Sequence, residues 1–267
     1  MISGVTYVEL KQFLGTLALT QPRILAMCAM LPLFNRQILP GMLRYAVAAS
    51  MGLLLVPTLQ AKYAVMDAGL IELVLIISKE VFIGVVLGFL IAIPFWIFEA
   101  VGFVIDNQRG ASLGATINPA TGNDSSPMGI LFNQAFMVFF LVGGGFALML
   151  TILYDSYRLW DVFSWTPTLR AESVPVFLEQ LSRFMRMVLL LGAPAIIAMF
   201  LSEIGLALVS RFAPQLQVFF LAMPIKSGLA LLVLVLYMST LFDYVGEMIG
   251  DIRGIVPLLD AQWRAAP

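Results

Sequence analysis

Six long apolar segments constrain the fold of this chain more than any other feature. They cover about residues 13–34, 43–59, 70–105, 128–153, 176–212 and 218–250. A helix needs about 20 apolar residues to cross a bilayer core of about 30 Å. Hydrophobic residues make up 61% of the 267 residues and charged residues 12%, against about 25% charged in ordinary soluble domains. The sequence therefore predicts an all-α, polytopic membrane protein with broken helices.

The lengths and flanking charges of these segments do not fit six simple bilayer spans. The second segment is short and is expected to end near Pro57, whereas the third, of about 36 residues, would extend about 54 Å as a helix. If all six segments cross, one side carries Lys11, Lys62, Arg158, Arg170, Arg183, Arg186, Arg253 and Arg264. The other side carries five cations, so the bias towards cytoplasmic termini is weak. Such a bias is expected if packing into a complex fixes the final position.

Several functional classes are disfavoured by composition. The net charge of −1 argues against nucleic-acid binding, which calls for a basic surface. The chain has no histidine and a single cysteine, Cys28, which excludes histidine-dependent triads and argues against zinc sites. Phosphate-binding and dinucleotide-binding glycine motifs are absent. We therefore expect no catalytic, metal or cofactor site.

The longest polar stretch, residues 106–127, is a candidate pore or plug loop. It is rich in glycine, asparagine, serine and proline, which favour turns over helix. Its candidate residues are Arg109, Gly110, Gly114, Asn118, Pro119 and Gly122. About twenty residues without regular structure in a compact protein indicate either function or disorder. A flexible external loop and an ordered insert into a central cavity both remain open.

Charged residues inside apolar segments, or directly at the end of one, are the second candidate feature. They are Glu80, Glu99, Asp106, Glu203, Arg211 and Lys226. Glu99, Gly102, Asp106 and Arg109 follow helical spacing and share one face, and Asp106 and Arg109 can pair at i,i+3. Charges at bilayer depth are costly without a partner or a watery cavity. They are expected either to pair between helices or to line an aqueous path that responds to the membrane potential.

Prolines and glycines indicate how the helices break and pack. Pro214 and Pro224 lie ten residues apart in a mostly apolar stretch, and Lys226 follows the second proline. The two prolines predict a helix break in this stretch. Small-residue patterns occur at Gly84 and Gly88, at residues 143–145, and at Gly246 and Gly250. Such patterns let helices approach closely in membranes.

Three blocks of the sequence resemble one family, the T component (SctT) of the type III secretion export apparatus, whose flagellar counterpart is FliR. The first block runs from Arg23 to Pro57, and the second from Lys79 to Gly122. The third is PQLQVFFLAMPIKSG, from Pro214 to Gly228. The flagellar form usually carries PLK where this chain has PIK, which favours the virulence-type injectisome.

The resemblance implies a subunit of a helical export gate in the bacterial inner membrane, within the secretion basal body. Its partners would be the R and S components, with the U and V components and the inner rod as further contacts and secreted proteins as cargo. Residues 1–175 would be R-like, residues 176–250 an S-like hairpin, and 251–267 a polar tail. By the same resemblance, residues 106–127 match the loop that helps to plug the closed pore in relatives. A secondary transporter of a small solute is the alternative, since broken helices with buried charge serve that function too.

Overall fold

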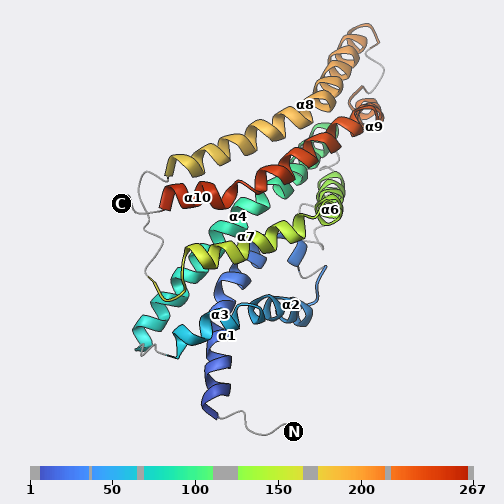
Figure 1. Ribbon diagram of the computed structural model, residues 1–267. Helices are drawn as coiled ribbons and strands as arrows, with labels where there is room; N and C mark the ends of the chain where they lie inside the picture. The colour runs from blue at the N-terminus through green and yellow to red at the C-terminus, as the bar shows by residue number, and fades with distance from the viewer. Residues whose placement is uncertain are drawn as a thin grey trace. The chain divides into compact units, whose positions relative to one another are not determined.

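The computed structural model describes residues 7–35, 38–64, 69–110, 126–164, 174–213 and 218–263, which form helices joined by turns (Figure 1). The elements are α1 (Tyr7–Met30), the 3₁₀ turn η1 (Pro32–Phe34), α2 (Gly41–Leu53), α3 (Val56–Tyr63), α4 (Leu70–Arg109), α6 (Pro127–Val142), α7 (Gly145–Leu159), α8 (Val174–Phe212), α9 (Val218–Ile252) and α10 (Ile255–Trp263). In the described ranges, α1, α4, α8 and α9 are long and apolar enough to cross a membrane. The bent pairs α2–α3 and α6–α7 raise the number to six, which confirms the polytopic helical fold.

Two of the predicted segments are bent pairs of helices. The second segment does not end near Pro57: α2 and α3 meet at a bend of 70°, and α3 continues to Tyr63. Pro57 lies in the first turn of α3, where its missing N–H breaks no intrahelical hydrogen bond. The fourth segment bends by 74° between α6 and α7. Gly144 adopts φ +77° at that bend, a left-handed conformation that favours glycine.

Proline residues inside the long helices do not end them. Pro22, Pro94 and Pro194 lie within α1, α4 and α8. Pro224, expected at a helix break, lies inside α9, which continues from Val218 to Ile252. Neighbouring turns of a long apolar helix tolerate one missing hydrogen bond. Pro214 lies outside the described residues.

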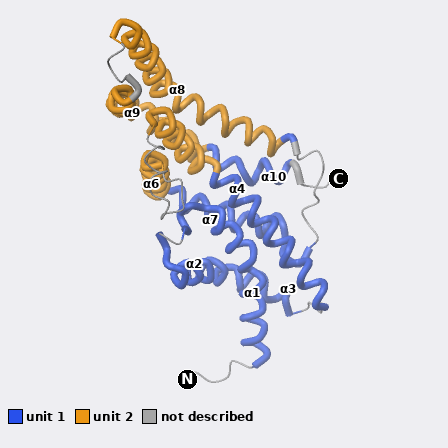
Figure 2. Tube along the Cα trace, turned by 180° about the vertical axis from the view of Figure 1, so that it is seen from behind, with its two compact units in different colours: residues 1–92, 144–175, 251–267 blue, residues 93–143, 176–250 orange. Residues whose placement is uncertain are grey.

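The chain packs into two compact units (Figure 2). Unit 1 comprises residues 1–92, 144–175 and 251–267, and unit 2 comprises residues 93–143 and 176–250. Helix α4 contributes its first part to unit 1 and its last part to unit 2. These packing units cut the chain differently from the predicted division at residue 175, which rests on family resemblance and stays a prediction.

Unit 1 is built around close contact between α1 and the first part of α4. A Cβ atom added to Gly84 would meet the backbone carbonyl of Arg23, and one added to Gly88 would lie 2.7 Å from the carbonyl oxygen of Met27. Ile83 and Leu87, on the same part of α4, are fully buried. The predicted close packing at Gly84 and Gly88 is confirmed.

Unit 2 has an aromatic seam between α4 and α6. The Phe95 ring lies 4.7 Å from Phe136 and 5.1 Å from Phe140, centroid to centroid. Phe98 lies 5.0 Å from Phe136. Edge-to-face and tilted aromatic pairs at these distances add about 0.5–1.5 kcal/mol each to the burial of the rings. The seam fixes how α6 lies on the last part of α4.

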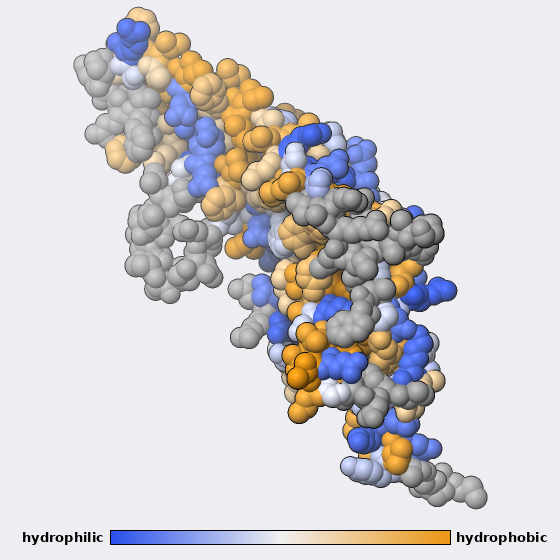
Figure 3. Space-filling view, turned by 90° about the vertical axis from the view of Figure 1, so that its left-hand side faces the viewer, coloured by the Kyte–Doolittle hydropathy of each residue, from blue (hydrophilic) through white to orange (hydrophobic). Residues whose placement is uncertain are grey.

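Helices α8 and α9 leave much of their apolar surface uncovered. The most apolar stretch of α4 is 72% buried, but those of α8 and α9 are 28% and 11% buried. A Cβ atom added to Gly246 or Gly250 of α9 would have no described atom within 4 Å. Among the described residues, no helix therefore packs closely against these two glycines. Figure 3 shows wide apolar patches on the surface.

Candidate functional site at the end of helix α4

The charged face predicted on α4 is a packing seam with α6 inside unit 2. Asn133 Nδ2 donates a hydrogen bond to Glu99 Oε2 at 2.7 Å. One turn further along α4, the backbone of Met128 and Gly129 lies so close to Gly102 that no side chain fits between the helices. Pairing between helices, one of the two interpretations left open by the sequence, therefore applies to this face.

One buried carboxylate, that of Asp106, ties the two ends of the predicted loop together. Ser126 Oγ donates to Asp106 Oδ2 at 2.6 Å, and the backbone N–H of Met128 donates to the same oxygen at 2.9 Å. Arg109 Nε donates to Asp106 Oδ1 at 2.7 Å, which forms the expected i,i+3 pair. Gly110 follows with φ +82°. The chain therefore leaves α4 and enters α6 at neighbouring points.

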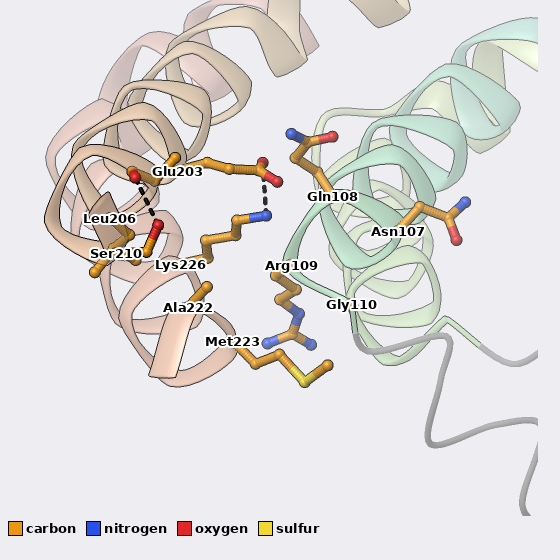
Figure 4. Close-up of a pocket in the computed structure, with 11 residues that line it drawn as sticks. Asn107, Gln108, Arg109, Gly110, Glu203, Leu206, Ser210, Ala222, Met223 and Lys226 are labelled. Atoms are coloured by element: carbon orange, nitrogen blue, oxygen red, sulfur yellow. Dashed lines mark hydrogen bonds and ion pairs between the residues drawn. The ribbon is translucent and has the colours of Figure 1, made fainter. Parts of the chain in front are cut away.

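A pocket of about 400 Å³, lined by charged, polar and apolar residues, opens beside this point, between the end of α4, α8 and α9 (Figure 4). It is lined by Asn107, Gln108, Arg109, Gly110, Glu203, Leu206, Ala207, Ser210, Ala222, Met223 and Lys226. Lys226 Nζ donates to Glu203 Oε2 at 2.7 Å, so the lysine of α9 has its acid on α8. The Arg109 side chain points towards Met223 in the same pocket (Figure 4).

The pocket brings hydrogen-bonding groups of several kinds together. Its amides, guanidinium, ammonium and carboxylate can bind water or a polypeptide backbone. Ser210 Oγ donates to the carbonyl of Ala207 in its own helix, whereas the Glu203 carboxylate of the same pocket accepts from Lys226. Four predicted site residues, Arg109, Gly110, Glu203 and Lys226, meet here.

The six predicted charged positions differ in their burial within the single chain. Glu80 and Asp106 are buried and Lys226 is half-buried. The exposed ones are Glu99, Glu203 and Arg211. Hydropathy identifies a long apolar helix but not which of its faces neighbours cover, and α8 is covered by few described residues. The predicted loop residues Gly114, Asn118, Pro119 and Gly122 lie outside the described residues, so their role stays a prediction.

The sequence did not identify the partner of Glu80, which is Arg23 in unit 1. Arg23 Nε and Nη2 donate to the two Glu80 oxygens at 2.8 and 2.9 Å, and both side chains are fully buried. Arg23 also donates to Ser156 Oγ at 3.0 Å and to the Trp160 carbonyl at 2.9 Å. Its guanidinium lies 4.0 Å from the centre of the Tyr157 ring. The position of Arg23 inside an apolar segment is the one sequence signal for a charged partner of Glu80. The packing of α1, α4 and α7 brings the two side chains together.

Lys79, next to Glu80, fixes the chain after α7. Its ammonium lies 3.1 Å from Glu80 Oε1 and donates to the carbonyls of Asp161, Val162 and Ser164 at 2.8–2.9 Å. Its three hydrogen bonds to backbone carbonyls are charge-assisted and therefore stronger than neutral ones. The hydrogen bonds of Arg23 and Lys79 given above all lie within unit 1, which indicates a structural role for this cluster.

Comparison with known proteins places the chain. Residues 14–252 match the family described as bacterial export proteins, family 1. The chain is 38% identical over 250 residues to Yop proteins translocation protein T of Yersinia pestis, covering 92% of this chain and 95% of the relative. It is 36% identical over 235 residues to surface presentation of antigens protein SpaR of Salmonella typhimurium, covering 87% and 86%. Flagellar biosynthetic protein FliR of Bacillus subtilis is 26% identical over 225 residues, covering 84% and 86%. The predicted relationship is therefore confirmed, and the chain belongs to family 1 of the bacterial export proteins.

Proposed function

We propose that this chain is a structural, pore-forming subunit of a type III export gate that passes unfolded proteins through the bacterial inner membrane. The observation that carries the proposal is the family match over residues 14–252. The relatives named for Yop translocation and antigen presentation share 38% and 36% identity, against 26% for the flagellar relative. This favours an injectisome-type gate. The same match favours protein export over the transport of a small solute.

The uncovered surface of α8 and α9 supports assembly with other subunits. A helix that is apolar all round is stable when other helices or lipid cover it, and only 11% of the most apolar stretch of α9 is buried. Gly228, Gly246 and Gly250 leave room for the close approach of a neighbouring helix. We assign this surface to the R and S components, with the U and V components, the inner rod and secreted proteins as further contacts.

We propose that residues 106–127 plug the closed pore. Deletion of residues 111–122 should leave the complex assembled and make it leak small ions. Because Asp106 holds Ser126 and Met128 at the end of α4, shortening the loop should not displace α6. The measurement is uptake of a small impermeant dye by cells that express the variant, together with a pull-down of the companion subunits.

A loop of equal length made of glycine and serine is the control for this deletion. It keeps the flanking geometry and removes only the side chains of residues 111–122. Assembly without leakage in the deleted form would contradict the plug. Loss of assembly in both variants would show that the loop is a packing element instead.

Replacing Lys226 by leucine should reduce secretion more than stability. The ion pair with Glu203 joins an acid that is 51% exposed, so its loss costs at most about 1 kcal/mol. The pocket, however, loses its ammonium group. We expect Lys226→Leu to lower the amount of secreted protein in culture supernatants, and Lys226→Arg to lower it less. Wild-type secretion by Lys226→Leu would show that the side chain is dispensable.

A further inference from the structure

Unit 1 carries a surface with charged and apolar groups, and none of its residues lines the pocket of Glu203 and Lys226. Two neighbouring hollows, of about 430 and 900 Å³, share Arg158 of α7. Lys62 of α3 lines the first hollow, and Arg253, just before α10, lines the second. We name the surface formed by Lys62, Arg158 and Arg253 the basic rim.

The basic rim has more positive than negative charge. Its three cations face two carboxylates, Asp155 and Asp161. Burial alone would raise the pKa of Asp161, but hydrogen bonds from Lys62 and a backbone N–H, with the charges of the nearby lysines, lower it. Lys62 and Asp161 therefore form a charged pair, which leaves Arg158 and Arg253 to face Asp155.

Arg158 keeps most of its hydrogen-bonding capacity. Its Nη1 lies 3.9 Å from Asp155 Oδ1, which is too long for a hydrogen bond. Its side chain is 84% exposed. A guanidinium has five N–H donors in a planar fork that matches the oxygens of a phosphate. The rim therefore offers an unsaturated anion-binding group at its centre.

Exposed apolar groups lie directly beside these cations. Leu54, at the bend between α2 and α3, lines the first hollow and is 68% exposed. Leu55, Leu59 and Tyr154 line the same hollow. Cations next to exposed apolar and amphipathic aromatic side chains suit a ligand with a phosphate group and an alkyl chain.

The weak flanking-charge bias, which was counted with these same cations, agrees with one membrane side for the rim. Lys62, Arg158 and Arg253 come from three separate parts of the sequence that this assignment puts on that side. The fold of unit 1 brings these three together around two adjoining hollows. Basic pockets beside membrane helices on the cytoplasmic side bind the headgroups of anionic lipids.

We infer that the basic rim is a binding site for an anionic phospholipid, with Arg158 and Arg253 on the phosphate and Leu54 along the acyl chain. The test is native mass spectrometry of the full chain in detergent, titrated with dioleoyl phosphatidylglycerol or dioleoyl phosphatidylcholine. We expect preferential binding of phosphatidylglycerol. Each lost arginine should weaken it about fivefold, the effect of about 1 kcal/mol per cation near a lipid surface.

The variants are Arg158→Gln, Arg253→Gln and the double substitution, and Arg186→Gln is the matched control. Arg186 is an exposed arginine of α8 in unit 2, so its loss changes the net charge equally. Leu54→Asn should weaken the binding of both lipids. Equal binding of the two lipids by the wild type, or equal effects of Arg158→Gln and Arg186→Gln, would overturn the site. If the double substitution leaves lipid binding unchanged but a companion subunit is lost when the complex is purified, the rim binds a protein partner instead.

Discussion

Replacing Glu80 by glutamine should destabilise the chain by about 3–5 kcal/mol, the cost of removing one partner of a buried ion pair. Arg23 is fully buried and donates two hydrogen bonds to the Glu80 carboxylate. Without that charge, the guanidinium and the neighbouring Lys79 ammonium keep their desolvation cost and lose their counter-charge. The measurement is the midpoint of thermal unfolding of the purified chain in mild detergent.

Glu72→Gln is the matched control, because Glu72 is an exposed acid in the first turn of the same helix. We expect it to change stability by less than about 0.5 kcal/mol. Removing both charges, in Arg23→Met combined with Glu80→Leu, should recover much of the loss, since apolar groups of similar size often replace a buried pair without cost. Equal unfolding midpoints for Glu72→Gln and Glu80→Gln would refute the role assigned to the pair.

Adding one methyl group at Gly102 should separate α4 from α6. Its Cβ would overlap the backbone of Met128 and Gly129, which cannot move without shifting the start of α6. Overpacking of this kind costs about 1–3 kcal/mol, occasionally more. The tie between Asp106 and Met128 is expected to break with it. Hydrogen exchange of the Met128 amide, together with the unfolding midpoint, measures both effects.

Gly228→Ala controls for the substitution itself. Gly228 lies in α9 and meets no described atom within 4 Å of an added Cβ. Alanine there should be neutral or stabilise the isolated chain by about 0.5–1 kcal/mol, because glycine weakens the interior of a helix. If Gly102→Ala unfolds at the same midpoint as Gly228→Ala, the close approach of α4 and α6 is not what holds unit 2 together.

The sequence itself determined the helical class, the six apolar segments and the family. Each depends on local composition: long runs of apolar residues predict helices, and three motifs in order carry the resemblance. The i,i+3 pair of Asp106 and Arg109 was also predictable, because helical spacing alone places the two side chains together. Positions that depend on a single helix could thus be inferred from the chain alone.

The tertiary structure decided everything that depends on two helices meeting. Hydropathy indicated that Glu80 and Lys226 needed partners, but it could not identify Arg23 and Glu203, which lie 57 and 23 residues away from them in the chain. Hydropathy also does not show that Glu99, Glu203 and Arg211 are exposed within the single chain, because burial depends on which helix face a neighbour covers. The role of Gly144 was missed for a similar reason, since a glycine triplet suits both close packing and a left-handed bend. Local sequence determines the helices, whereas contacts between residues distant in sequence determine the ion pairs, the helix bends and the pocket.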